Sequence, residues 1–321
     1  MMIVRYVDAT GRPAVGVESE GRIRPLPENP TLGGLLRSSP ADIRAACELA
    51  LQDPGMEATE VRLLPPVDSR MEVWAAGVTY RRSREARVEE SDQAADVYEL
   101  VYDAERPELF FKSVAWRVTG DGEQISVRRD SEINVPEPEL ALVLTTAGEV
   151  AGYTICNDVS SRSIEGENPL YLPQAKVYLG GCAVGPGIRP AWELPDPRAL
   201  GMQMEIRRGD DVVWQGSAST SELRRGLEEL VEFLFREESF PDGAVLSTGT
   251  SLVPDLPATL LPGDRVSIRI DQIGTLTSEV RGGKAEMAWL AGAADRPDRR
   301  PSSSSRGTPR DERALDDAAS G

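Results

Sequence analysis

The 321-residue chain contains no histidine. This absence excludes catalysis by an imidazole base, Ser–His or Cys–His nucleophile pairs, and zinc sites built on His ligands. Proton transfer must therefore rely on Glu, Asp, Lys, Tyr or a metal-bound water. Lysine is scarce as well, since only Lys112, Lys176 and Lys284 occur among 36 basic residues. Because Lys can release its proton and Arg cannot, a Lys retained in an Arg-rich chain marks a candidate functional position.

Other features that the sequence lacks limit the classes of protein to which it can belong. Three cysteines, Cys47, Cys156 and Cys182, are scattered without a Cys-x-x-Cys pair, which indicates reduced thiols in a cytoplasmic setting. The first 30 residues lack the apolar core of a signal peptide, and no 18-residue apolar run occurs, so we expect no membrane contact. A net charge of −17 argues against a nucleic-acid partner, which would require a basic stripe.

The chain is predicted to contain two domains of the α+β class and a tail. Residues 1–66 indicate a small N-terminal α+β domain, in which Met2–Val7 and Ala14–Val17 form a hairpin and Leu32–Leu51 has helical apolar spacing. Residues 67–293 are rich in short strands, Gly and Pro, and form the larger domain. Residues 294–321 are rich in Arg, Asp, Ser and Pro, so we expect a disordered tail whose removal is harmless.

Within the larger domain, three local patterns are clear enough to predict. A hairpin turned by Gly209-Asp210 should join Met202–Arg207 to Val212–Gln215. The Leu spacing over Ser219–Arg236 predicts a helix capped near its start. The alternation over Arg265–Ile270 predicts another strand.

Two carboxylates open an apolar run, because Glu137 and Glu139 precede residues 140–144. Residues i and i+2 of a strand point to one face, so these carboxylates repel each other unless a cation lies between them. Asp158 ends a second strand-like run over residues 150–157. If the two runs pair as neighbouring strands, three carboxylates converge. Such an all-oxygen cluster suits a hard divalent ion: Mg²⁺, Mn²⁺ or Ca²⁺.

These residues belong to a set of motifs that resembles the fumarylacetoacetate hydrolase family. Over residues 70–290 the motifs follow in the family's order and spacing: Glu137-Pro138-Glu139, Asn157-Asp158-Val159-Ser160-Ser161-Arg162, Lys176 before a Gly- and Pro-rich turn, Ser247-Thr248-Gly249-Thr250, and Pro262-Gly263-Asp264 followed by Ile270-Asp271-Gln272-Ile273-Gly274-Thr275-Leu276. The resemblance implies a β-rich roll, a divalent metal held by Glu137, Glu139 and Asp158, and a homodimer or dimer of dimers.

One departure from the family pattern narrows the expected reaction. Many hydrolases and decarboxylases of the family carry Gly-x-Asn-Tyr-x-x-His, whereas this chain has Thr79 in place of Asn and Ser83 in place of His. The usual imidazole–carboxylate dyad of the hydrolases is therefore missing. The amino-acid sequence of residues 80–87 and 163–169 resembles instead that of the sugar-acid branch of the family, typified by 2-keto-3-deoxy-D-arabinonate dehydratase.

This second resemblance implies a Mg²⁺-dependent hydro-lyase that acts on a small anionic 2-keto-3-deoxy sugar acid through a metal-bound enolate. Lys176 is expected to stabilise the enolate charge, and Glu165 and Glu167 are candidates for proton transfer. The expected substrate contacts are Tyr80, Arg82, Ser83, Lys112 and Thr250. Packing or surface positions are the plain alternatives for Lys112, Tyr80 and the two acids. Residues 80–106 are either a solvated charged helix or a lid over the substrate.

Two other functions are compatible with the residues. The first is hydrolysis of an acylpyruvate or fumarylacetoacetate-type substrate, decarboxylation of an oxaloacetate-like acid, or isomerisation of an unsaturated keto-diacid. The second is a non-catalytic keto-acid-binding protein, which the loss of a metal ligand would favour. All three expected ligands are present. The sequence sets neither the chain length nor the stereochemistry of the substrate.

Overall fold

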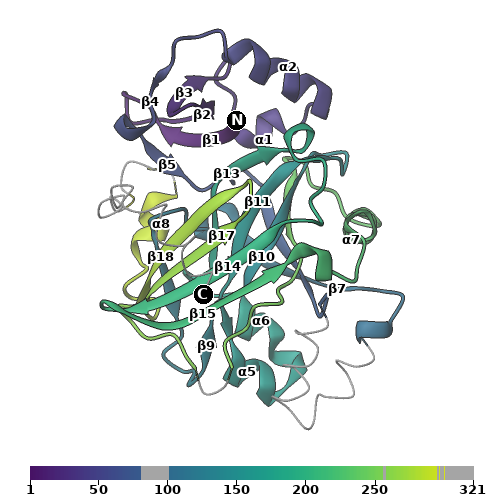
Figure 1. Cartoon of the computed structure of the whole chain (residues 1–321), viewed down its shortest axis with the longest axis vertical. Helices are drawn as coiled ribbons and strands as arrows, with labels where there is room; N and C mark the ends of the chain where they lie inside the picture. The colour runs from purple at the N-terminus through teal and green to yellow at the C-terminus, as the bar shows by residue number, and fades with distance from the viewer. Residues whose placement is uncertain (81–100, 256–257, 295, 297–299, 301–321) are drawn as a thin grey trace, which may run out of the picture.

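The computed structural model describes residues 1–80, 101–255, 258–294, 296 and 300. A small N-terminal unit lies on a larger, β-rich body (Figure 1). One sheet of eleven strands extends through both parts in the order β4-β3-β2-β1-β13-β11-β10-β16-β6-β7, with β5 paired to β1. This arrangement confirms the predicted β-rich α+β class.

The N-terminal unit packs short helices against the end of the eleven-stranded sheet. Its strands are β1 (Met2–Val7), β2 (Pro13–Ser19), β3 (Arg22–Pro25), β4 (Met56–Glu57) and β5 (Arg62–Leu64). The predicted hairpin is confirmed, since β1 and β2 pair antiparallel. The helical spacing predicted over Leu32–Leu51 is confirmed, and the segment divides into two helices, α1 (Leu32–Leu35) and α2 (Pro40–Ala50). Pro40 cannot continue a helix but suits its first turn, and the Ser39 side chain caps α2.

The larger body contributes the other six strands of the main sheet. They are β6 (Glu72–Gly77), β7 (Glu108–Val114), β10 (Pro138–Leu144), β11 (Val150–Asp158), β13 (Cys182–Pro190) and β16 (Ala244–Ser247). All seven residues of β10 are buried, because β10 is an inner strand covered on both faces. Leu140 and Leu142 face the second sheet, while Ala141 and Val143 face the cluster that contains Ile43 of α2. Burial on both faces explains the uninterrupted apolar run in the sequence.

A second sheet covers the main sheet and completes the core. Its strands lie in the order β15 (Asp211–Ser219), β14 (Gly201–Arg208), β17 (Arg265–Ile270), β18 (Gly274–Gly282) and β8 (Gln124–Val127). The predicted β14–β15 hairpin and the β17 strand are confirmed. The predicted helix from Ser219 is wrong at its start, because β15 extends to Ser219 and α7 (Leu227–Phe235) begins later. Ser219 instead caps a 3₁₀ turn over Thr220–Glu222.

Short elements at one end of the body surround the acidic motif. A two-stranded ladder joins β9 (Asn134–Val135) to β12 (Ser160–Ser161). Helix α5 (Arg162–Glu167) follows β12 directly, and α6 (Leu172–Lys176) comes after a short 3₁₀ turn. Ser161 caps α5 by accepting a hydrogen bond from the Ile164 N–H. Two sequence segments predicted to carry catalytic residues are thereby turned back over the ends of β10 and β11.

The two parts of the chain are joined by strand pairing, ion pairs and hydrogen bonds at several places. Strand β1 pairs with β13 through Ile3 and Ile188. Beyond α8 (Trp289–Ala293), Arg300 is 8% exposed, and its Nη1 lies 2.5 Å from Glu123 Oε2. Arg62 of β5 donates a hydrogen bond to the Arg300 carbonyl at 2.6 Å. The sequence predicts a disordered tail over residues 294–321; within it Arg300 makes these contacts, and residues 301–321 lie outside the described part.

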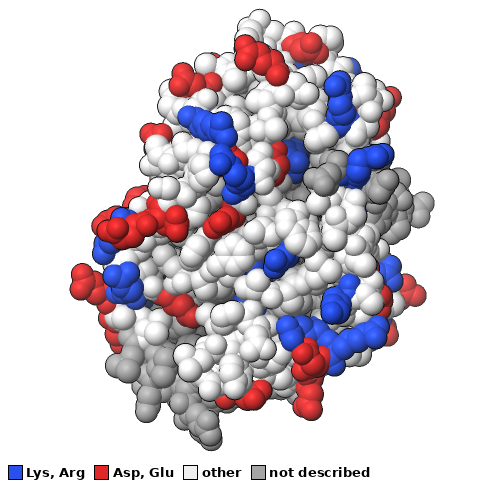
Figure 2. Space-filling model, turned by 180° about the vertical axis from the view of Figure 1, so that it is seen from behind, with Lys and Arg blue, Asp and Glu red and all other residues white. Residues whose placement is uncertain are grey.

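The face turned away in Figure 1 carries charged residues of both signs. On the described part of that face, basic and acidic side chains lie in small interspersed groups rather than in one basic stripe (Figure 2). None of the helices in the described ranges has both the length and the apolar content needed to cross a membrane.

Candidate active site

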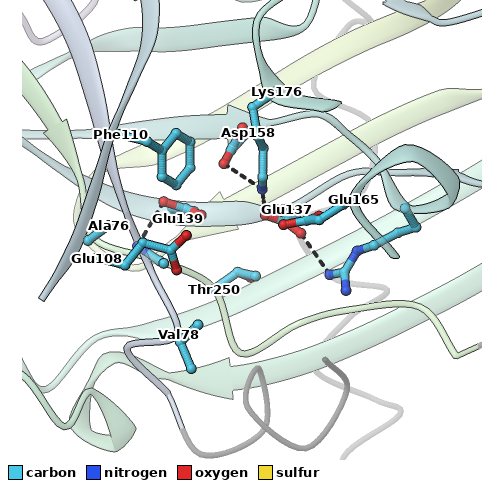
Figure 3. A pocket seen from close by; sticks show the side chains of 13 residues that line it. Ala76, Val78, Glu108, Phe110, Glu137, Glu139, Asp158, Glu165, Lys176 and Thr250 are labelled. Carbon is cyan, nitrogen blue, oxygen red and sulfur yellow. Dashed lines mark hydrogen bonds and ion pairs between the residues drawn. The ribbon is translucent and has the colours of Figure 1, made fainter. Parts of the chain in front are cut away.

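Three carboxylates converge where β10 and β11 end. Glu139 pairs in register with Cys156, so Glu137, one residue before β10, lies beside Asp158, whose N–H donates to the Glu137 carbonyl. Each of the three residues is at most 2% exposed. One oxygen from each carboxylate lies within 4.8 Å of the others. The predicted pairing of the two strands is thus confirmed, and the acidic residues lie together (Figure 3).

Three buried cations surround this cluster. Lys176 Nζ lies 2.7 Å from Glu137 Oε2 and 3.0 Å from Asp158 Oδ2, and it donates to Ser160 Oγ at 2.6 Å. Arg162 Nη2 lies 2.7 Å from Glu137 Oε1. Lys112 Nζ lies 2.5 Å from Asp158 Oδ1. Glu137 and Asp158 each contact cationic side chains, so their negative charges are compensated inside the protein.

Glu139 is held by neutral donors instead. Ser247 Oγ and the Gly249 N–H both donate to its Oε2. Burial, followed by repulsion from Asp158, raises the pKa of Glu139 well above its ordinary value. A residue with a side chain could not replace Gly249, because its φ is +90° and a Cβ would overlap Thr79 Oγ1. Among the described residues, no Lys or Arg forms an ion pair with Glu139 that would stabilise its ionised form.

The donor set fits a hard divalent ion. Three carboxylates supply only oxygen ligands, and a 2+ charge beside Glu139 would relieve the electrostatic penalty that raises its pKa. Zinc sites usually include Cys or His, and this cluster has neither. The residues that would hold the metal are Glu137, Glu139 and Asp158.

One pocket gives access to this cluster, and two more carboxylates line it. Glu108, at the start of β7, and Glu165, in α5, reach into the hollow that contains the three expected ligands (Figure 3). Glu165 is 3% exposed, and Glu108 is half-buried. Gly77 pairs with Glu108 across β6 and β7, and a Cβ at Gly77 would overlap the Glu108 carboxylate. Glycine at this position therefore leaves the space that Glu108 occupies.

Several predicted site residues line the pocket and others do not. Lys176, Glu165 and Thr250 line it. Lys112 does not: its Nζ is buried among Asp158 and two backbone carbonyls, so the expected contact with a substrate carboxylate is wrong. Tyr80 also does not line the pocket, because its ring is buried in the main core, and burial raises the pKa of its phenol.

Two further predictions differ in outcome. Glu167 is exposed at the end of α5 and does not line the pocket, so it is not placed for proton transfer in this structure. Arg82 and Ser83, and most of the proposed lid over residues 80–106, lie outside the described residues.

Sequence reasoning missed Glu108 and gave no role to Arg162. A usable signal for Glu108 was present, since an acidic residue opens the apolar strand Glu108-Leu109-Phe110-Phe111. Glu108 and Phe110 are two residues apart in β7, and both line the pocket. An acid on the same strand face as an inward-facing aromatic residue would have been a reasonable candidate.

Comparisons with known proteins point to one family. The model of the fumarylacetoacetate hydrolase C-terminal domain matches residues 72–281. A probable 2-keto-3-deoxyxylonate dehydratase of Haloferax volcanii is 53% identical over 215 residues, which are 67% of this chain and 73% of that protein. The 2-dehydro-3-deoxy-D-arabinonate dehydratase of Saccharolobus solfataricus is 45% identical over 228 residues, covering 70% and 76% of the two chains.

A solved structure extends the similarity to nearly the whole described fold. It is a 2-keto-3-deoxy-D-arabinonate dehydratase complexed with magnesium and 2,5-dioxopentanoate. Its chain is 37% identical to this one, with a TM-score of 0.75, and the match covers 88% of this chain and 99% of that chain.

Proposed function

Because the chain belongs to the fumarylacetoacetate hydrolase family, we propose that it is a divalent-metal-dependent dehydratase of a 2-keto-3-deoxypentonate. The observation that carries this proposal is the composition of one pocket: three clustered carboxylates, Lys176, and two further carboxylates that are not needed as ligands. The names of the relatives from Haloferax volcanii and Saccharolobus solfataricus support the same reaction.

The proposed substrate has one stereocentre. D-arabinonate and D-xylonate differ only at C2 and C3, and conversion to a 2-keto-3-deoxy acid removes both centres. The two parent sugar acids therefore yield the same compound, which retains only the configuration at C4. Loss of water from it gives 2,5-dioxopentanoate, the compound present in the magnesium complex of the related dehydratase.

The metal and Lys176 have separate tasks in this proposal. A divalent ion held by Glu137, Glu139 and Asp158 would polarise the C2 ketone and so acidify the protons on C3. Lys176 places an ammonium group beside two of those ligands. Its charge would stabilise the negative charge that develops on the C2 oxygen as a C3 proton leaves. In this arrangement Lys176 is a charge stabiliser, since its three N–H groups are directed at Glu137, Asp158 and Ser160.

Proton transfer falls to the two carboxylates outside the ligand set. Glu108 removes one C3 proton, and Glu165 donates a proton to the C4 hydroxyl, which leaves as water when the C4–O bond breaks. The product of this step has a C3=C4 double bond. Removal of a C5 proton and return of a proton to C3 give the C4=C5 enol, which becomes the C5 aldehyde. The sum of these transfers is the loss of one water, and none needs imidazole.

Product analysis tests the proposal directly. The protein should be incubated with both C4 isomers of 2-keto-3-deoxypentonate and with an acylpyruvate, with and without Mg²⁺, and the products identified by NMR. We expect 2,5-dioxopentanoate from the D isomer only when Mg²⁺ is present. Formation of pyruvate from the acylpyruvate at a higher kcat/KM would overturn the dehydratase assignment in favour of C–C hydrolysis.

We also propose that the enzyme acts in the cytoplasm, in the breakdown of sugar acids, as a homodimer or a dimer of dimers. The family resemblance supports the assembly, and the three free cysteines of the described chain support a reducing compartment. Light scattering coupled to gel filtration would measure the assembly, and a monomer at micromolar concentration would contradict it.

A further inference from the structure

Lys112 is buried next to the acidic cluster but does not line the pocket. Its side chain is 0% exposed. The Nζ atom lies 2.5 Å from Asp158 Oδ1, 3.0 Å from the Val159 carbonyl and 2.6 Å from the Lys176 carbonyl. The ammonium group thus donates hydrogen bonds to two main-chain carbonyls and forms an ion pair with one oxygen of Asp158. These partners direct Lys112 away from the pocket and so away from a substrate.

The three partners of Lys112 belong to two segments that the proposed reaction uses. Asp158 is an expected metal ligand, and Val159 follows it in the chain. The third acceptor is the main chain of Lys176, whose own Nζ lies 3.0 Å from Asp158 Oδ2. One buried ammonium thus fixes the second oxygen of a ligand carboxylate, and it also fixes the backbone that carries the charge-stabilising residue.

This geometry suits Lys better than Arg. The three acceptors converge on one atom, which a compact ammonium satisfies and a planar guanidinium with spread donors does not. The Tyr178 ring, centred 5.7 Å from Lys112 Nζ, also borders this space, and its hydroxyl donates to the same Val159 carbonyl. In a chain that otherwise uses Arg, this arrangement gives a physical reason for a Lys at position 112.

We propose that Lys112 is a positioning residue of the metal site: it orients Asp158 toward the metal and places Lys176 beside the ligands. The inference rests on the proposed function, because it assumes that this cluster binds a divalent ion. Hydrogen-bond partners behind metal ligands commonly control affinity, and their loss costs about 10- to 100-fold in metal affinity or activity.

The test measures Mn²⁺ binding to the full chain without substrate, using the electron paramagnetic resonance signal of free Mn²⁺. Lys112→Met should raise the Mn²⁺ Kd about 10- to 100-fold relative to wild type. Lys284→Met, the same change at an exposed lysine, should leave the Kd unchanged. At saturating Mn²⁺, Lys112→Met should still show a reduced kcat, because Lys176 is no longer held. A residue with a merely structural role would lower the melting temperature and leave the Kd of the folded protein unchanged.

A second variant keeps the test decisive if Lys112→Met does not fold. Lys112→Gln retains an amide that can donate to the two carbonyls but removes the charge next to Asp158, and it should also weaken Mn²⁺ binding at least 10-fold. A Kd within threefold of wild type for the folded variants would overturn the positioning role alone. Failure of the wild-type protein to bind Mn²⁺ would instead overturn the proposed metal-dependent function, and the inference with it.

Discussion

Replacing Arg300 with Met should destabilise the protein strongly, although the residue lies near the end of the chain. Arg300 and Glu123 have side chains that are 8% and 4% exposed, and Nη1 of the first lies 2.5 Å from Oε2 of the second. Arg300 Nη2 also donates to the Val118 carbonyl at 3.2 Å. The substitution removes these contacts but keeps the main-chain carbonyl that accepts from Arg62. The substitution therefore tests the contribution of the Arg300 side chain alone, whereas truncation at Ala294 would remove both its side-chain contacts and its main-chain contact.

The expected magnitude follows from burial. Removing one partner of a buried ion pair costs about 3–5 kcal/mol, because the other charge stays desolvated without its partner. For a chain of this size we expect a fall in melting temperature of roughly 5–15 °C. Differential scanning fluorimetry or calorimetry at pH 7 measures it. Arg44→Met is the matched control, because the Arg44–Glu48 pair is exposed and should contribute at most about 1 kcal/mol.

The pH dependence separates the charge effect from lost packing. Burial raises the pKa of Glu123 above its ordinary value of 4.5, and Arg300 opposes that rise. A raised carboxyl pKa favours the folded state below pH 4.5, and this contribution is lost as the pH rises through the folded-state pKa. Without Arg300 the pKa rises further, so the variant should lose most stability at neutral pH. The difference from wild type should shrink near pH 4. A melting temperature within 1 °C of wild type at pH 7 would refute this reasoning.

Three further predictions concern the site. Treatment with EDTA should abolish activity and Mg²⁺ or Mn²⁺ should restore it, while Glu139→Gln should weaken metal binding at least tenfold; full turnover by exhaustively metal-free protein would contradict the metal role. Glu108→Gln should lower kcat by about 10²- to 10⁴-fold. With pyruvate as a simple 2-keto acid in place of the substrate, the same variant should stop the exchange of C3 protons for deuterium in D₂O, which NMR follows. Glu167→Gln, the same change at an exposed acid, is its control, and exchange at the wild-type rate in Glu108→Gln would exclude Glu108 as the base. Lys176→Met should reduce kcat far more than it raises KM, whereas a higher KM with unchanged kcat would mean that Lys176 only binds substrate.

The parts of the fold that were predictable from the sequence are formed by residues that lie close together in the sequence. The β1–β2 and β14–β15 hairpins have turns between strands of matching pattern, and both formed as expected. The metal cluster was predictable because Glu137 and Glu139 lie two apart in one strand and Asp158 ends the strand beside it. Local features that compete with periodicity were not predicted. Pro40 divides the first apolar pattern into two helices, and the extended strand β15 delays the start of the helix expected from Ser219.

The missed residues act across long distances in the sequence. Arg300 reaches Glu123 over 177 positions, and Lys112 reaches Val159 and Lys176 over 47 and 64 positions. No periodicity or motif within one segment of the sequence predicts which buried charged residues form pairs. The rarity of Lys singled out Lys112, but the direction of its side chain was not predictable, because an inward-facing Lys can point into a pocket or behind it. Only the packing of β7 against the residues after Asp158 decides between these positions.

The charges of the site explain how a chain without histidine can perform this chemistry. Five carboxylates line the pocket, from Glu108, Glu137, Glu139, Asp158 and Glu165, and three buried cations surround them, from Lys112, Lys176 and Arg162. With Glu165 protonated, as its proposed role as proton donor requires, the four other carboxylates exceed the three cations by one charge, and a divalent ion would outweigh that excess. The cations contact Glu137 and Asp158, so the ion is most needed at Glu139, the ligand whose pKa burial raises. With the ligands neutralised in this way, the proposed proton transfers by Glu108 and Glu165 do not require an imidazole.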